Sequence, residues 1–215
     1  MTAPVKRAVV LSAVPVSVAM ARYLCSGDTV VACDAGYRNA ERLGVRPDQL
    51  IGDFDSAPRP ETGADTIVLP HVKDDTDTQY AARWLAEHGY GRVTLLGALG
   101  GARLDHTLAS IATGLYLAKA GVETLLADER CELRYLLPGR PLTLDREDWQ
   151  YLSLFPLEGR TEGLCISGVF YPLENAALTA DYPLGVSNEF TAPQARLSCA
   201  SGAVLVLLTK SDAPA

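Results

Sequence analysis

Acidic residues gather in two short stretches of the sequence, GDFDS at 52–56 and KDDTD at 73–77. In the first stretch, Asp53 and Asp55 are separated by one phenylalanine and follow an apolar approach, which indicates a turn held against the body of the protein. Two carboxylates this close repel each other unless a cation or a proton lies between them. Oxygen ligands of this kind suit Mg²⁺, although a solvated turn would also explain the pair.

The second acidic stretch stands at the expected start of a helix. The positive end of a helix dipole favours each aspartate by about 0.3–1 kcal/mol, which is a structural explanation for the cluster. Asp77, however, heads a helical row that continues with Tyr80, Ala81 and Trp84. Because that row should face the sheet, its charged tip needs a partner, which a metal or a substrate amine could supply.

A glycine-rich stretch, GALGGARLDH at 97–106, precedes another expected helix. It matches neither of the common nucleotide fingerprints, G-x-x-x-x-G-K-[ST] and G-x-G-x-x-G. Arg103 stands beside the start of that helix, where its positive charge opposes the dipole. A polyphosphate would explain the placement, because arginine binds phosphate through two donors, and an ion pair with Asp105 would explain it equally well. We expect His106 to form a local hydrogen bond.

The first half of the chain must position these loops. Short apolar runs alternate there with helical periodicity, which predicts an α/β fold: a mainly parallel, Rossmann-like sheet with flanking helices. The expected strands are 8–12, 29–33, 66–69, 92–96 and 123–127, and the expected helices are 16–25, 37–43, 75–88 and 104–120. Since ligands bind beyond the carboxyl ends of parallel strands, we expect the acidic and glycine-rich loops to form one magnesium and polyphosphate site.

The second half of the chain has a different residue pattern. From about residue 132, prolines and glycines recur every several residues and no helical pattern can be drawn. Short β-like segments such as YLSLF and AVLVLL predict a smaller all-β sandwich. We therefore expect two domains, 1–130 and 131–212, that meet near 128–133.

Composition limits the partners and the compartment. With 19 basic and 26 acidic residues, the net charge of −7 argues against nucleic acid and anionic lipid. The sequence lacks the roughly 20-residue apolar run that spans a membrane. Five scattered cysteines favour reduced thiols and a cytoplasmic protein. Residues 6–21 also imitate a short secretory signal, but the βα rhythm that follows favours a strand and a helix.

In this order and with these separations, CDAG, RPDQLIGDFDS, KDDTDT and GALGGARLDHTLAS resemble the thiamine pyrophosphokinase family. YLSLFPLEG and GVSNEF resemble the family's β-rich domain, so the resemblance covers nearly the whole chain. It implies an ATP-binding catalytic α/β domain and a thiamine-binding β-sandwich, in a homodimer with active sites at the subunit interface. The implied reaction transfers the β,γ-diphosphoryl group of ATP to the hydroxyl of thiamine, which gives thiamine diphosphate and AMP.

The resemblance also implies roles for individual residues. Mg²⁺ would be bound by Asp53, Asp55 and Asp77, and the catalytic set would add Arg103 and Asp105. The nucleotide would contact Asp34, Gly36, Gly52, Lys73, Asp74, Thr76, Arg103, Asp105 and His106. Thiamine would be held by Asp77, Ser187 and Asn188.

Two positions depart from the family pattern. Gln79 stands where the family often has a glutamate, and Ala102 is an extra residue in the usual G-G-R-x-D-H, so we expect no role for Gln79. Two other functions stay open. One is a non-catalytic thiamine- or nucleotide-binding protein, and the other is a magnesium-dependent phosphatase, although Ser56-Ala57 lacks the threonine usual in D-x-D-x-T phosphatases.

Overall fold

The computed structural model describes residues 4–54, 63–70 and 74–211. The chain divides into two compact units, Met1–Glu129 and Arg130–Ala215. Within the described ranges, every helix is too short or too polar to cross a membrane.

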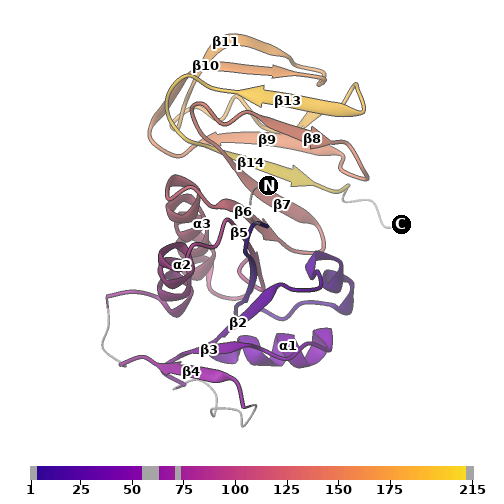
Figure 1. Cartoon of the computed structure of the whole chain (residues 1–215). Helices are drawn as coiled ribbons and strands as arrows, with labels where there is room; N and C mark the ends of the chain where they lie inside the picture. Colours follow the sequence, from indigo (N-terminus) through magenta and orange to yellow (C-terminus); the bar gives the residue numbers. More distant parts are fainter. Residues whose placement is uncertain (1–3, 55–62, 71–73, 212–215) are drawn as a thin grey trace. The chain divides into compact units, whose positions relative to one another are not determined.

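The first unit is built on a parallel sheet with the strand order β6-β5-β1-β2-β3-β4 (Figure 1). Its strands are β1 (Arg7–Leu11), β2 (Thr29–Cys33), β3 (Gln49–Gly52), β4 (Asp65–Val68), β5 (Arg92–Leu96) and β6 (Glu123–Ala127). The five expected strands are confirmed to within one residue, and β3 is an addition. The chain progresses from β1 to β4 in one direction and returns to β5 on the other side of β1. That reversal leaves a crevice at the carboxyl ends of β1 and β5.

Helices cover both faces of this sheet: α1 (Tyr37–Leu43), α2 (Asp77–Glu87) and α3 (Leu104–Lys119). The α1 helix packs in one hydrophobic cluster with Ala32 of β2. Neighbouring strand residues point to opposite faces, so Cys33 points to the α2 side, where its Sγ lies 3.7 Å from a backbone oxygen of α2. Figure 1 shows α2 and α3 side by side, with α1 across the sheet from them.

The helix expected at 16–25 was wrong in type and start. A 3-10 helix, η1 (Val18–Tyr23), occupies the middle of this range, and the residues before it form an irregular connection. The reason is a contact with a distant residue, because the backbone N–H of Val16 donates to the Asn39 side chain at 3.1 Å and holds the preceding residues in that connection.

The buried row of α2 differs in part from expectation. Of the expected Tyr80, Ala81 and Trp84 only Ala81 is buried, together with Ala82 and Leu85, so Asp77 still heads a buried row at spacings of four. In α3 the first turns are not buried, since Leu104 and Leu108 are 70% and 59% exposed.

The second unit is the expected all-β sandwich. Its strands are β7 (Cys131–Leu136), β8 (Leu142–Asp145), β9 (Tyr151–Pro156), β10 (Arg160–Ser167), β11 (Leu173–Thr179), β12 (Asn188–Glu189), β13 (Gln194–Ser198) and β14 (Val204–Thr209). They pair antiparallel in the orders β12-β9-β14-β7 and β11-β10-β13-β8. Side chains from both layers share one hydrophobic core with Trp149, which lies between β8 and β9.

Candidate active site

A cavity of about 580 Å³ opens in the first unit at the carboxyl edge of the parallel sheet. Its walls come from the connections after β1, β2, β3 and β5 and from the first turns of α2 and α3. This is the crevice that the strand order predicts. A cavity of this size lies within the range of small-molecule sites.

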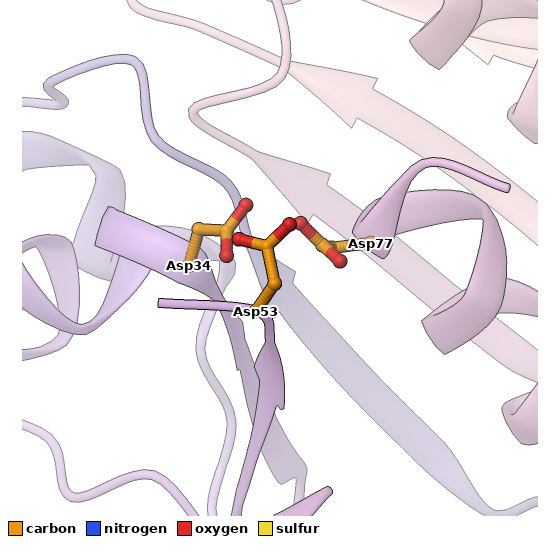
Figure 2. A group of neighbouring side chains, drawn as sticks. All are labelled: Asp34, Asp53 and Asp77. Atoms are coloured by element: carbon orange, nitrogen blue, oxygen red, sulfur yellow. The ribbon is translucent and has the colours of Figure 1, made fainter. Parts of the chain in front are cut away.

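Three aspartates from separate stretches of sequence meet in this cavity. Asp34 follows β2, Asp53 follows β3, and Asp77 begins α2. Each offers a carboxylate oxygen, and these oxygens lie within 4.8 Å of one another. Figure 2 shows the three side chains pointing toward a common centre. A set of three converging carboxylates is a suitable donor set for a hard divalent cation.

Backbone geometry and a glycine bring Asp34 into this cluster. Asp34 begins the short 3-10 helix η2 (Asp34–Gly36) with a φ of 46°, a left-handed conformation that aspartate adopts more readily than most residues. A Cβ at Gly52 would lie 2.2 Å from Asp34 Oδ1, so only glycine leaves room for the carboxylate. Phe54 also has a positive φ, 54°, and packs against the core on the α1 side. The turn that carries Asp53 is therefore held against the body of the protein, as expected.

The start of α2 positions Asp77. Thr76 is the N-cap, and its side chain accepts a hydrogen bond from Gln79 N at 3.1 Å. The hydroxyl oxygens of Ser12 and Thr78 lie 3.1 Å apart, which ties this turn to the end of β1. The helix start is thus fixed independently of any ligand.

The described carboxylates that lie together differ in one residue from the set expected to bind the metal. Asp53 and Asp77 lie together as expected, while the third described carboxylate is Asp34, which was assigned to the nucleotide. Asp55 and Lys73 lie outside the described residues.

Arg103 is paired with Asp105, the alternative that the sequence left open. Their shortest nitrogen–oxygen distance is 2.5 Å, and both side chains are about two-thirds exposed (66% and 64%). The hydrogen bond from Arg103 lowers the pKa of Asp105 to about 2 and raises that of Arg103. Because the carboxylate pKa is depressed, the pair is complete above about pH 4 and is lost as the pH falls through about 2. At neutral pH an anion entering the cavity must compete with Asp105 for Arg103.

The other expected nucleotide residues lie in three different settings. Thr76 and His106 line the cavity. Gly36 and Gly52 serve close packing instead, since a Cβ at Gly36 would lie 1.9 Å from the carbonyl oxygen of Leu11. Asp74 is exposed.

Sequence reasoning missed two contributors to this region. Gln79 has a structural role, because its Oε1 accepts a hydrogen bond from Thr113 Oγ1 at 2.8 Å and so links α2 to α3. Thr107 lines the cavity and donates to the Gly100 carbonyl at 3.2 Å, which secures the glycine-rich loop to α3. The spacing of Gln79 and Thr113, 34 residues apart, carries no local signal for their contact.

The expected thiamine residues Ser187 and Asn188 lie in the second unit. Ser187 is exposed, has a φ of 59°, and donates its backbone N–H to Ser153 Oγ at 3.0 Å. Asn188 is buried, and its amide bonds both backbone groups of Tyr171 at 2.9 Å. Asn188 therefore fixes the turn that carries Tyr171, and Ser187 is the residue of the two that presents a side chain to solvent.

Comparison with models of known protein families shows to which family this chain is related. Residues 20–126 match the model described as "Thiamin pyrophosphokinase, catalytic domain". Residues 142–204 match "Thiamin pyrophosphokinase, vitamin B1 binding domain". The chain belongs to the thiamin pyrophosphokinase family. The two matched segments fall in the two compact units, one in each.

Individual relatives agree with this assignment. Thiamine pyrophosphokinase of Bacillus subtilis is 28% identical over 188 residues, which are 85% of this chain and 87% of the relative. Thiamin pyrophosphokinase 1 of Caenorhabditis elegans is 25% identical over 169 residues, 74% of this chain and 68% of the relative. The crystal structure of the Bacillus subtilis enzyme superposes with a TM-score of 0.86 at 22% identity and covers 96% of this chain and 100% of its own, which shows the shared fold.

Replacement of Gly52 by alanine should weaken metal binding. The new Cβ would displace the Asp34 carboxylate from the cluster, because their separation would be 2.2 Å. We expect Mn²⁺ affinity without nucleotide, measured by electron paramagnetic resonance titration, to fall by about tenfold or more. Gly27→Asn, in an open left-handed turn away from the cavity, is the control and should leave the affinity unchanged. Equal Mn²⁺ affinity in Gly52→Ala and the unmodified protein would remove Asp34 from the metal set.

Proposed function

We propose that this chain transfers the β,γ-diphosphoryl group of ATP to the hydroxyl of thiamine, with AMP as the other product. The observation that carries the proposal is the convergence of Asp34, Asp53 and Asp77 in a cavity of the unit that matches the family's catalytic domain. Transfer of a phosphoryl group depends mainly on positioning and on charge neutralisation, which an acidic, metal-binding crevice can provide.

The three described carboxylates fit Mg²⁺, which prefers oxygen ligands and retains sites for phosphate oxygens. We assign Asp34, Asp53 and Asp77 as its protein ligands, and Asp55 stays a proposed fourth. When bound, Mg²⁺ neutralises charge on the phosphate oxygens. Two roles remain for the chain's own groups. Arg103, released from Asp105, binds the transferring phosphates, and Asp77 or Asp55 accepts the hydroxyl proton of thiamine.

The second unit is proposed to bind thiamine and to form a homodimer. Its matched model is named for vitamin B1 binding and includes Ser187. Phe170, Tyr171, Tyr182 and Leu184 are each 60–66% exposed, which is unusual for large apolar side chains. The rings of Phe170 and Tyr171 meet edge to face with centroids 4.9 Å apart. Exposed aromatic rings suit both a cationic heterocycle and a second subunit, which supports an active site completed at a subunit interface.

Product analysis separates this proposal from its alternatives. Purified protein would be incubated with thiamine, ATP and Mg²⁺, and the products resolved by chromatography. The proposal predicts equal amounts of AMP and thiamine diphosphate. Free phosphate without thiamine diphosphate would indicate the phosphatase, and unchanged substrates would indicate the non-catalytic binding protein.

Substitution of Asp53 by asparagine should reduce kcat by at least about 100-fold, because the amide removes a negative ligand from the cluster. The far-UV circular dichroism and Tm should stay close to those of the unmodified protein. Asp65→Asn, at an exposed position at the start of β4, is the matched control and should retain full activity. Full turnover of Asp53→Asn at saturating Mg²⁺ would refute the assigned role of this carboxylate.

Substitution of Ser187 by glycine should raise the KM for thiamine several-fold and leave the KM for ATP unchanged. Glycine adopts the φ of 59° without strain, so the variant removes the serine side chain and its hydroxyl without straining the backbone. Ser198→Gly, on the exposed side of β13, would be the control. Steady-state kinetics with each substrate varied in turn would test this, and an unchanged KM for thiamine would exclude a contact with Ser187.

A further inference from the structure

One wall of the cavity is an irregular connection between β1 and η1, here named the wall loop, residues 12–17. Asn39 of α1 holds this loop from behind and is 1% exposed. Its Nδ2 donates to the carbonyl oxygens of Ser12 and Val14, at 2.7 and 2.8 Å. Its Oδ1 accepts from Val16 N and from Arg42 Nη1, each at 3.1 Å. Both donor hydrogens and both acceptor positions of the amide are therefore used.

These bonds involve alternate residues of the wall loop. The backbone groups of Ser12, Val14 and Val16 turn toward Asn39, while Ala13 and Pro15 between them are exposed. Both exposed residues line the cavity. One buried amide thus determines which side chains of the loop face a ligand.

A second set of contacts joins the wall loop to the glycine-rich loop after β5. Ser12 N donates to the Leu96 carbonyl at 2.8 Å, and Val14 N donates to the Gly97 carbonyl at 3.0 Å. Gly97 has a φ of 67°, and a Cβ on it would lie 2.8 Å from Asn39 Nδ2 and less than that from two carbonyl oxygens of the wall loop. The space around the Asn39 amide is therefore filled, and a displaced amide would disturb both loops together.

The chemistry of the cavity differs from one region to another. Asp34, Asp53 and Asp77 supply carboxylates, whereas Ala13, Pro15 and neighbouring Ala98 supply apolar surface. A nucleotide has the same division between a charged phosphate chain and a flat base. Its phosphates fit the metal-binding carboxylates, so the apolar wall loop fits the nucleoside.

We propose that Asn39 is a positioning residue for the nucleotide, which acts by holding the wall loop in the form that contacts the nucleoside. This inference rests on the proposed function, because it assigns ATP to the cavity. Asn39 itself is covered by the loop, so its effect reaches the nucleotide through Ala13 and Pro15. Nucleotide affinity should therefore depend on the donors of Asn39, and thiamine affinity should not.

Asn39→Asp tests the proposal with little change in shape. The new carboxylate keeps the acceptor for Val16 N but places an oxygen where the amide nitrogen now lies 2.7 and 2.8 Å from two carbonyl oxygens. We expect the Kd of MgADP, measured by calorimetry, and the KM for ATP to rise by about tenfold or more. The KM for thiamine should change by less than about twofold.

Two further variants make the result decisive. Arg42→Gln removes an exposed donor to Asn39 Oδ1 and to the Val16 carbonyl. It should therefore raise the Kd of MgADP by a smaller factor than Asn39→Asp does. If Asn39→Asp does not fold, the Kd of MgADP in Arg42→Gln tests the proposal. Thr124→Val removes a buried hydroxyl of β6 that donates to Val122 O, and it should change Tm without changing the Kd of MgADP.

Three results would overturn the proposal. The first is an unchanged Kd of MgADP in both Asn39→Asp and Arg42→Gln. The second is a rise in the KM for thiamine in Asn39→Asp as large as the rise in the KM for ATP. The third is a loss of MgADP affinity in Thr124→Val as large as the loss in Asn39→Asp. Failure of the proposed function is distinguishable. It would appear as absence of thiamine diphosphate with the unmodified protein, while MgADP calorimetry still reports on the wall loop. Absence of MgADP binding by the unmodified protein would refute the inference as well.

Discussion

Mutual repulsion among three carboxylates is the constraint on which the rest of the structure depends. The ligand oxygens of Asp34, Asp53 and Asp77 lie within 4.8 Å of one another. At that separation two unit charges repel by roughly 3 kcal/mol in an environment with an effective dielectric constant of about 20. In the function that we propose, a bound cation offsets this repulsion and also binds phosphate oxygens. Under that proposal, binding of a metal-bound polyphosphate stabilises the site.

Local backbone geometry holds the three carboxylates close together. Gly52 leaves the space that the Asp34 carboxylate occupies, and Asp34 and Phe54 both adopt left-handed backbone conformations. Such conformations cost about 1–3 kcal/mol each and persist where the surrounding structure enforces them. Thr76 fixes the start of α2 and with it Asp77. Arg103, the cation at the cavity mouth, is paired with Asp105 and is available to an anion only by exchange.

Much of this could be predicted from sequence, for identifiable reasons. Apolar runs alternating with helical periodicity predicted the parallel strands, and spacings of three and four predicted that Asp77 heads a row facing the sheet, of which Ala81 is buried. The position of Asp34 beside Asp53 and Asp77 was not predicted, because it depends on the space left by Gly52, and close packing between separate loops has no periodic signal. The late start of the 3-10 helix was missed for a similar reason, since the hydrogen bond from Val16 to Asn39 that holds the preceding residues spans 23 residues. Local patterns thus predicted elements, and long-range polar contacts decided the details of the site.

The most direct test of this account is the position of a bound cation. Crystals grown with Mn²⁺ and a non-hydrolysable ATP analogue methylene-bridged between the α- and β-phosphorus would be measured at the manganese absorption edge. The account predicts an anomalous peak at coordination distance from the carboxylates of Asp34, Asp53 and Asp77, with the phosphate chain beside it. A manganese peak elsewhere in the protein, with these three side chains bound only to water, would contradict it.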